Sequence, residues 1–255
     1  MSRRLEGKVA IVTGAASGFG KGIAAKFVAE GGKVIVADLS AEAGQAVADS
    51  LGGASAAFQR ADVTRREDWE QLLRAVTEKF GGLDVVVNNA GTTYPNKPTE
   101  QVTDADFDVT FNVNVRSIYL STSVLLPYFL EGGGRPGVFI SLASTAGVRP
   151  RPGLAWYNAS KAAVINATKS MAVEYGPRKI RFNSVSPVFG SGTGLSSSFL
   201  GKPDTEENRA GFVATVPLGR GSTAADVANA CCYLASDEAD FITGVNLEVD
   251  GGRCV

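Results

Sequence analysis

The feature that most constrains the fold of this chain is a regular alternation of short β-branched segments with longer amphipathic ones. Several short segments are apolar throughout, which is typical of parallel strands covered by helices on both faces. Repeated alternation of this kind implies right-handed crossovers and predicts an α/β, doubly wound sheet of about seven parallel strands. The expected strands are residues 8–13, 33–37, 56–61, 83–88, 137–141, 180–185 and 245–249, and the expected helices are 19–30, 41–51, 66–80, 104–130, 156–175 and 224–235.

One segment, residues 188–217, departs from this alternation. It is rich in Gly and Ser and then mixes Phe199, Leu200 and Phe212 with charged residues. A long insertion between a late strand and a late helix is usually a functional lid or a disordered loop, and the apolar residues favour a lid. No internal repeat or long linker divides the rest. We therefore expect one domain over residues 1–255 with a substrate lid at 188–217.

Composition excludes several classes of function. The formal net charge of −1 lacks the positive excess of a nucleic-acid binder or of a polybasic membrane surface. No apolar run reaches the length of a spanning helix, and the charged N-terminus lacks the apolar stretch of a secretion signal. We therefore expect a cytoplasmic protein without nucleic-acid or membrane partners.

The chain contains no histidine and only three cysteines. The lack of histidine rules out a Ser-His-Asp triad and removes the commonest transition-metal ligand, so no metal site is expected. The adjacent Cys231 and Cys232 fit small buried apolar residues of a helix. Acid–base chemistry must therefore come from Tyr, Lys, Asp, Glu or Cys.

The first expected strand ends in a glycine-rich turn that leads directly into a helix. Glycines there let the backbone turn sharply and approach a pyrophosphate, which then lies at the positive end of the helix. A strand before the turn and a helix after it make a dinucleotide the expected ligand. The residues expected to bind it are Gly14, Ser17, Gly18, Phe19 and Gly20.

Asp38 ends the second expected strand, about 20 positions beyond these glycines. A carboxylate there is placed to accept hydrogen bonds from the adenosine ribose hydroxyls. It would repel a 2′-phosphate by on the order of 4 kcal/mol at about 4 Å and intermediate dielectric. The sequence therefore favours NAD over NADP, although Lys21 is an argument for NADP. An acid serving only the start of the next helix is the alternative.

Short segments with a polar residue also follow the third and fourth expected strands. These are Asp62 and Val63, then Asn89, Ala90 and Gly91. Ligands of open α/β sheets bind at the carboxyl ends of strands, so we expect both segments to contact the cofactor. A helix cap at Asp62 and a simple turn at the asparagines are the alternatives.

Tyr157 and Lys161 carry the expected chemistry. Residues four apart share one face of a helix, so the phenol and the ammonium are neighbours. A phenol near pKa 10 is a poor base at neutral pH, and a nearby cation favours the phenolate. This pair is therefore a candidate for acid–base catalysis, whereas many such pairs are only solvated neighbours.

Together these motifs resemble the core-length short-chain dehydrogenase/reductase family over essentially the whole chain. Residues 13–20 match TGxxxGxG, 88–91 match NNAG and 157–161 match YxxxK. The resemblance implies a single-domain Rossmann-type fold and NAD-dependent hydride transfer between a secondary alcohol and a ketone. It also implies that Ser144 is the catalytic serine and that Asn114 is the helix asparagine, for which Asn112 is a competitor.

The resemblance also assigns a role to each of these side chains. Tyr157 would exchange a proton with the substrate oxygen, and Ser144 would hydrogen-bond the same oxygen. Lys161 would lower the pKa of Tyr157 and hold the nicotinamide ribose. Asn114 would support a water beside Lys161. Tyr157 and Lys161 thus also count as cofactor-binding residues.

The chain departs from the family after the sixth expected strand. The family usually has Pro-Gly and then a Thr that contacts the nicotinamide amide, whereas here Pro187 is followed by Val188. Pro187 and Thr193 are the equivalents that we assign to the cofactor site. The family commonly forms tetramers through its two long helices, so a homo-oligomer, here a homotetramer, is expected.

The sequence leaves the small-molecule substrate open among sugars, hydroxy acids, cyclic or aromatic alcohols and β-keto thioesters. An NADPH-dependent ketone (3-oxoacyl-type) reductase and an idle NAD(H)-binding protein are the alternative functions. Substrate contacts are expected from three places: the lid, the segment after Gly91 and the loop before Tyr157. The candidates outside the lid are Thr92, Thr93, Tyr94, Arg149, Arg151, Leu154 and Trp156, and solvation is the alternative for the two arginines.

Overall fold

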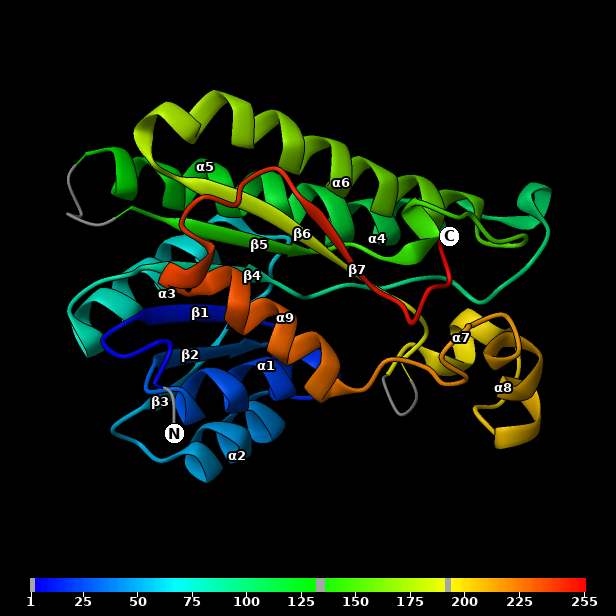
Figure 1. Cartoon of the computed structure of the whole chain (residues 1–255), viewed down its shortest axis with the longest axis horizontal. Coiled ribbons are helices and arrows are strands. Elements are labelled where there is room, and N and C mark those ends of the chain that lie inside the picture. Colours follow the sequence, from blue (N-terminus) through cyan, green and yellow to red (C-terminus); the bar gives the residue numbers. More distant parts are fainter. Residues whose placement is uncertain (1–2, 132–135, 191–193) are drawn as a thin grey trace.

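Seven parallel strands form one sheet through the centre of the computed structural model, which describes residues 3–131, 136–190 and 194–255 (Figure 1). The strand order is β3-β2-β1-β4-β5-β6-β7, which confirms the doubly wound parallel sheet expected from the sequence. The strands are β1 Val9–Thr13, β2 Lys33–Asp38, β3 Ala56–Arg60, β4 Val85–Asn88, β5 Val138–Leu142, β6 Arg181–Pro187 and β7 Asn246–Val249.

The strand order reverses at β1. Ile11 of β1 pairs with Ile35 of β2 on one side and with Val86 of β4 on the other. The chain winds outward from β1 through β2 to β3, then returns to β4 and continues to β7. The loops after β1 and β4 therefore diverge, and they leave the crevice in which open α/β sheets bind ligands.

Helices cover both faces of the sheet, because successive strand side chains point to opposite sides. Val34 and Val36 pack in the core beneath α1, α2 and α9, whereas Ile35 packs in the core beneath α3, α5 and α6. Figure 1 shows α1 and α9 on one face and α5 and α6 on the other. Their bounds are α1 Gly18–Ala29, α2 Ala41–Leu51, α3 Arg66–Phe80, α5 Ser117–Leu130, α6 Ala155–Tyr175 and α9 Ala224–Ala235.

Capping residues fix where several helices begin and end. Thr103 and Asp106 form a reciprocal capping box at the start of α4 (Asp104–Phe111), and Thr223 and Asp226 form another at α9. Such boxes satisfy two otherwise unpaired donors of the first turn. Gly81 ends α3 in the left-handed conformation that glycine adopts without steric cost. Short 3₁₀ turns lie at η1 Thr99–Gln101, η3 Thr145–Gly147, η4 Gly176–Arg178 and η5 Asp237–Ala239.

The helix expected over 104–130 is not continuous. A π-helical segment, η2 (Asn112–Arg116), separates α4 from α5. A π-turn inserts an extra residue into the helical register and is often found at functional sites. Here it lies at Asn114, one of the expected site residues.

The described part of the expected lid forms two short helices, α7 (Ser196–Leu200) and α8 (Glu206–Val213). Figure 1 shows them in yellow and orange, apart from the layers that cover the sheet. The rings of Phe199 and Phe212 lie 6.0 Å apart in an edge-to-face arrangement, and both are buried. The apolar residues of this segment therefore pack in a small separate core beside the sheet, together with Tyr94, Leu154 and Tyr157.

No helix within the described ranges combines the length and the apolar character that crossing a membrane requires.

Candidate active site

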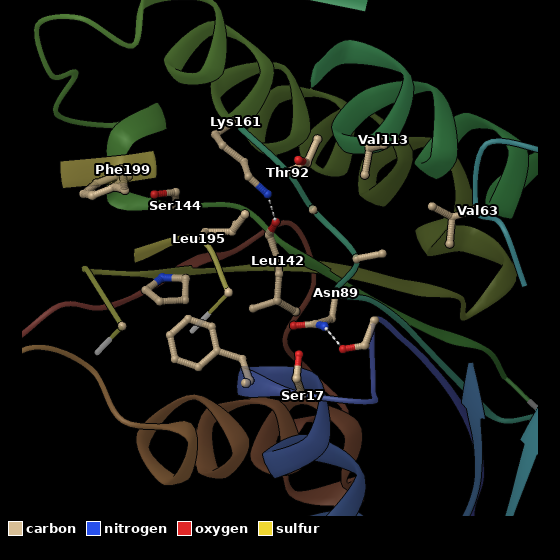
Figure 2. A pocket seen from close by; sticks show the side chains of 18 of the residues that line it. Ser17, Val63, Asn89, Thr92, Val113, Leu142, Ser144, Lys161, Leu195 and Phe199 are labelled. Carbon is tan, nitrogen blue, oxygen red and sulfur yellow. Dashed lines mark hydrogen bonds between the residues drawn. The ribbon is translucent and has the colours of Figure 1, made fainter. Parts of the chain in front are cut away.

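A cavity of about 550 Å³ runs across the carboxyl ends of the central strands. Figure 2 shows Val63 near one end and Ser144 and Phe199 near the other, with Asn89 and Ser17 between them. The cavity thus brings together most of the residues expected from the sequence. Those lining it are Gly14, Ser17, Gly18, Phe19, Asp38, Asp62, Val63, Asn89, Ala90, Gly91, Ser144, Tyr157, Lys161 and Pro187.

Packing between the loop after β1 and the first turn of α1 requires two glycines of the motif. Gly14 has a φ of +62°, and a Cβ there would lie 3.0 Å from the Ala90 Cα. A Cβ at Gly20 would lie 2.2 Å from the Gly14 carbonyl oxygen, which the loop cannot accommodate. Gly20 is buried and does not line the cavity, so its place in the motif is to let α1 pack on the loop.

Asn89 ties this loop to the end of β4. Its Nδ2 donates to the carbonyl oxygens of Thr13 at 2.7 Å and of Gly14 at 3.1 Å. The Thr13 hydroxyl in turn accepts from the backbone N–H groups of Asn89 at 3.0 Å and of Ala90 at 3.1 Å. Thr13 was not among the expected site residues, although it begins the glycine motif. Its hydroxyl helps to hold the loop after β1 against the segment after β4.

Asp38 combines the two roles considered for it. Its Oδ1 accepts from the Ser40 backbone N–H at 3.0 Å, next to the start of α2. Its Oδ2 accepts from the Ala16 backbone N–H at 2.9 Å, which holds the glycine-rich loop against β2. The side chain also lines the cavity, and each carboxylate oxygen keeps a second lone pair for a further donor.

Asp62 is partly engaged by its own turn. Its Oδ1 accepts from the Thr64 backbone N–H at 2.9 Å and from the Thr64 hydroxyl at 2.7 Å. These bonds shape the turn between β3 and α3. Asp62 and Val63 still line the cavity, so the turn interpretation and the ligand interpretation hold together.

Ser144, Tyr157 and Lys161 meet at the other end of the cavity. Tyr157 and Lys161 are 6% and 5% exposed, and the Lys161 Nζ lies 5.9 Å from the Tyr157 ring centroid. Burial raises the pKa of the Tyr157 phenol, and its side-chain hydrogen bond with Ser144 partly opposes this rise. The net direction is opposite to the lowering by Lys161 expected from the sequence, because desolvation disfavours the phenolate.

Burial also changes the lysine. It lowers the pKa of Lys161 to about 8, because the ammonium lies where water cannot solvate it. The Lys161 Nζ donates to the Leu142 carbonyl oxygen at 2.8 Å, a bond drawn in Figure 2. That carbonyl belongs to the last residue of β5, so the sheet itself orients the ammonium.

Asn114, not Asn112, is the buried asparagine of the π-helical segment. Asn114 is 2% exposed, whereas Asn112 is exposed to solvent. The Asn114 Oδ1 accepts from the Thr92 N–H at 2.8 Å, and its Nδ2 donates to the Thr92 carbonyl at 2.9 Å. The Nδ2 also donates to the Ser160 hydroxyl at 3.0 Å. Asn114 does not line the cavity but supports the segments that do.

The departure after β6 has a packing explanation. Pro187 ends β6 and lines the cavity, and Val188 and Phe189 follow it with side chains that are buried. The Phe189 ring lies 5.8 Å from that of Phe199, in the aromatic cluster of the segment expected to be a lid. Thr193, the assigned nicotinamide contact, lies outside the described residues.

Most of the expected substrate contacts do not line the cavity. Of the seven candidates outside the lid, only Thr92 does. Tyr94 is buried, and its hydroxyl accepts from the Trp156 backbone N–H at 3.0 Å. Arg149 is exposed and donates to the Arg253 carbonyl at 2.5 Å, whereas Arg151 is half-buried among aromatic rings. Leu195, Ser196 and Phe199, from the segment expected to be a lid, line the cavity instead.

The residues present fit a dinucleotide. The N-cap residue of α1, Ser17, makes no side-chain cap bond, and the first turn of α1 has no acidic residue. The N-terminus of α1 therefore suits an anion such as a pyrophosphate, and the Ser17 hydroxyl points into the cavity in Figure 2. Asp38, which lines the same cavity, supplies acceptors for hydroxyl groups. Among the described residues, no group of His, Cys, Asp and Glu side chains is arranged to hold a metal ion.

Comparisons with known proteins agree with this geometry. A family model described as enoyl-(acyl carrier protein) reductase matches residues 14–253. The 4-formylbenzenesulfonate dehydrogenase of Comamonas testosteroni is 47% identical over 98% of each chain. The 2,5-dichloro-2,5-cyclohexadiene-1,4-diol dehydrogenase of Sphingobium indicum is 36% identical over 100% of this chain and 99% of its own. The structure of a 3-ketoacyl-(acyl-carrier-protein) reductase from Brucella melitensis in complex with NADH superposes with a TM-score of 0.92. That protein is 42% identical, and the match covers 98% of this chain and 100% of that one.

Proposed function

Because this chain belongs to the short-chain dehydrogenase/reductase family of hydride-transferring oxidoreductases, we propose that it is an NAD-dependent dehydrogenase of secondary alcohols. One observation carries the proposal: a single cavity joins Asp38 and the glycine-rich loop to Ser144, Tyr157 and Lys161. The first group suits a dinucleotide, and the second suits the carbonyl or hydroxyl oxygen of a substrate. One cavity can therefore hold the cofactor and the substrate side by side.

The preference for NAD rests on Asp38. Its carboxylate lines the cavity, and an adenosine 2′-phosphate bound beside it would face a fixed negative charge. Two backbone N–H groups, of Ala16 and Ser40, hold the carboxylate, so it cannot readily turn away. The related reductase from Brucella melitensis was solved with NADH, which supports the same preference here.

Ser144, Tyr157 and Lys161 would carry out the proton transfer. Bound NAD⁺ supplies the chemistry of accepting a hydride from the carbinol carbon. The neutral Tyr157 phenol is placed to donate a proton to a carbonyl oxygen, and its phenolate form would accept one from a hydroxyl group. Ser144 shares a hydrogen bond with that phenol and would stabilise charge on the same substrate oxygen. Lys161, fixed by the Leu142 carbonyl, would favour the phenolate once charged.

For the substrate we propose a cyclic or aromatic alcohol or its carbonyl product. The related dehydrogenases named above act on a formyl-substituted benzene and on a cyclohexadienediol. Val109, Val113, Phe189 and Phe199 line the cavity of this chain, so apolar ring atoms would find apolar partners there. These four residues do not determine whether the substrate carries a charge.

A 3-oxoacyl-type ketone reductase is the second candidate. The matching family model and the Brucella melitensis structure both carry names of acyl-carrier-protein reductases. Such an enzyme would reduce a β-keto thioester and, in the form considered from the sequence, would use NADPH. Asp38 is the feature that argues against NADPH.

The experiment compares NAD⁺ and NADP⁺ reduction with 1-phenylethanol, cyclohexanol, a sugar and a hydroxy acid as substrates. It also tests reduction of an acetoacetyl thioester with NADH and NADPH. Turnover of a ring alcohol with NAD⁺, lost in Tyr157→Phe while NADH still binds, is the expected result. Thioester reduction with NADPH alone would establish the second candidate. NADH binding without turnover of any compound would favour an idle NAD(H)-binding protein.

We also propose that the chain forms a homotetramer. The surface of α5 and α6 carries an apolar groove of about 520 Å³, beside which Tyr119 is 60% exposed. Contiguous exposed apolar surface of this kind is common at interfaces between subunits. Light scattering of the purified protein measures the assembly, and Tyr119→Glu should reduce its mass.

A further inference from the structure

Arg151, in the loop before α6, lies against the aromatic core of the lid. Its guanidinium carbon is 4.4 Å from the centroid of the Phe199 ring and 4.6 Å from that of Phe212. Cations over aromatic faces at such distances are attracted to the ring electrons. These contacts hold the guanidinium in place, but they supply none of the hydrogen-bond acceptors that its N–H groups require.

Arg253, near the C-terminus, brings a second guanidinium to the same place. Its guanidinium carbon is 5.6 Å from the centroid of the same Phe212 ring. Its backbone is fixed, because its carbonyl accepts from Arg149 at 2.5 Å and the Asp250 carboxylate accepts from the N–H groups of Gly252 and Cys254 on either side. Two positive charges are therefore held near each other by separate parts of the chain.

Within the described part of the chain, no carboxylate neutralises the charge of either guanidinium. The Arg151 Nη1 and the Arg253 Nε and Nη1 are buried atoms without a hydrogen-bond partner, and no carboxylate there forms an ion pair with either residue. Burial and, secondly, the charge of Arg253 lower the pKa of Arg151. Both residues are half-buried, and N–H donors shielded from water without an acceptor are costly. The pair is therefore a candidate site for a ligand that provides the acceptors.

The pair lies one aromatic ring away from the candidate catalytic residues. Phe199 lines the cavity, and its ring centroid is 6.1 Å from that of Tyr157. The same ring contacts Arg151. Figure 2 shows Phe199 beside Ser144 at this end of the cavity. Arg151 does not itself line the cavity, so a substrate with its reacting oxygen at Ser144 and Tyr157 would reach Arg151 past the Phe199 ring.

We propose that Arg151 and Arg253 bind an anionic group, a carboxylate or a sulfonate, on the far side of the substrate ring from the reacting carbon. The inference rests on the proposed function, which places the reacting oxygen of the substrate at Ser144 and Tyr157. Arg151 makes the direct contact, and Arg253 adds a second positive charge. Guanidinium groups suit the paired oxygens of a carboxylate or a sulfonate, because their N–H donors are fixed in a fork. Phe199 and Phe212 exclude water and so strengthen the attraction.

The test compares ketones that differ only in charge: acetophenone, 4-acetylbenzoate and 4-acetylbenzenesulfonate, each reduced with NADH. We expect kcat/KM to be at least about tenfold higher for the two anions, the ratio that one charge-assisted hydrogen bond supplies. Arg151→Gln should remove this preference through a higher KM for the anions, and leave acetophenone reduction within about twofold. Arg151→Lys should restore part of it, because the charge is kept.

The matched control is Arg209→Gln. Arg209 lies on α8 beside Phe212 in sequence, and its guanidinium is paired with Asp204. This variant removes one positive charge from the same lid without touching Arg151, so it should keep the preference for anions. Melting temperatures of all variants check that the lid remains folded.

A binding measurement separates this proposal from the proposed function. Titration of the protein with 4-methylbenzenesulfonate, which has no reacting carbonyl, should show binding that Arg151→Gln and Arg253→Gln weaken about tenfold and Arg209→Gln does not. If no ketone is reduced but this pattern holds, the function fails and the anion site stands. Equal binding by Arg151→Gln and Arg209→Gln, or equal kcat/KM for neutral and anionic ketones, would overturn the anion site.

Discussion

The Asn114 side chain closes on the backbone of Thr92, accepting from its N–H at 2.8 Å and donating to its carbonyl at 2.9 Å. This pair links the π-helical segment between α4 and α5 to the loop that follows β4. A third bond from the Asn114 Nδ2 to the Ser160 hydroxyl reaches α6, one residue before Lys161. One buried carboxamide therefore holds three segments around the candidate active site.

Replacement of this carboxamide should be costly to the fold. Asn114→Ala leaves the Thr92 N–H and carbonyl without side-chain partners, whereas the Ser160 hydroxyl keeps its bond to the Tyr157 carbonyl. We expect a loss of about 2–3 kcal/mol in the free energy of unfolding. Asn112→Ala, two residues away and exposed, is the matched control and should change stability by less than about 0.5 kcal/mol. Urea denaturation of the two variants measures both values. Equal effects would show that the assignment to Asn114 is wrong.

Asp38→Ala should relax the preference for NAD. Removal of the carboxylate abolishes its repulsion of a 2′-phosphate, and we expect the ratio of kcat/KM for NADP⁺ to that for NAD⁺ to rise by about tenfold or more. The Ala16 and Ser40 N–H groups lose their acceptor as well, so the melting temperature should fall. Glu42→Ala removes an exposed acid from the first turn of α2 and serves as the control. The same change of ratio in both variants would mean that overall charge, not Asp38, sets the preference.

The sheet could be predicted from the sequence because parallel strands covered on both faces leave a strong pattern. Val34, Ile35 and Val36 are all apolar and all buried, and the expected segment 33–37 is observed as Lys33–Asp38. The glycine-rich turn was equally clear, because its glycines are required by backbone geometry. Tyr157 and Lys161 follow from a helical spacing of four, which the observed α6 preserves.

Other features depend on contacts that a linear pattern does not record. The π-turn at Asn114 occurs within one continuous apolar pattern, so a single helix over 104–130 was expected. The raised pKa of Tyr157 comes from burial by distant segments and opposes the effect expected from Lys161 four residues away. Arg151 resembles a solvated loop residue until Phe199 and Phe212, far along the chain, are placed against it. The tetramer, the cytoplasmic location and the role of Thr193 stay predictions.

Gly20→Ala and Gly211→Ala should change the free energy of unfolding in opposite directions. A Cβ at Gly20 would lie 2.2 Å from the Gly14 carbonyl oxygen, so Gly20→Ala should cost on the order of 1–3 kcal/mol and weaken NADH binding. Gly211 lies within α8 with no atom within 4 Å of an added Cβ, so Gly211→Ala should stabilise by about 0.5–1 kcal/mol. Thermal denaturation and NADH titration measure both. Destabilisation by Gly211→Ala would contradict the observed position of α8.

Tyr157 should remain protonated beyond the usual range of tyrosine in the protein without added cofactor. Because burial raises its pKa above 10, the near-ultraviolet absorbance of tyrosinate should differ between wild type and Tyr157→Phe only above pH 10. Tyr157 is the residue that would donate the proton, so ketone reduction should be supported at neutral pH. A tyrosinate signal specific to Tyr157 at pH 7–8 would show that Lys161, not burial, dominates its pKa.

Lys161 should make the fold less stable at neutral pH than at alkaline pH. Its pKa is lowered from 10.5 to about 8 in the folded protein, so between these values the unfolded chain binds the extra proton. The free energy of unfolding contributed by this group therefore rises as pH increases from 8 to 10.5. Lys161→Met removes the buried charge, and should raise stability at pH 7 by on the order of 1–3 kcal/mol while abolishing turnover. Lys169→Met, an exposed lysine of the same helix, is the control. Urea denaturation at pH 7 and pH 10 measures the difference, and an unchanged pH dependence in Lys161→Met would mean that the ammonium is solvated in the folded protein.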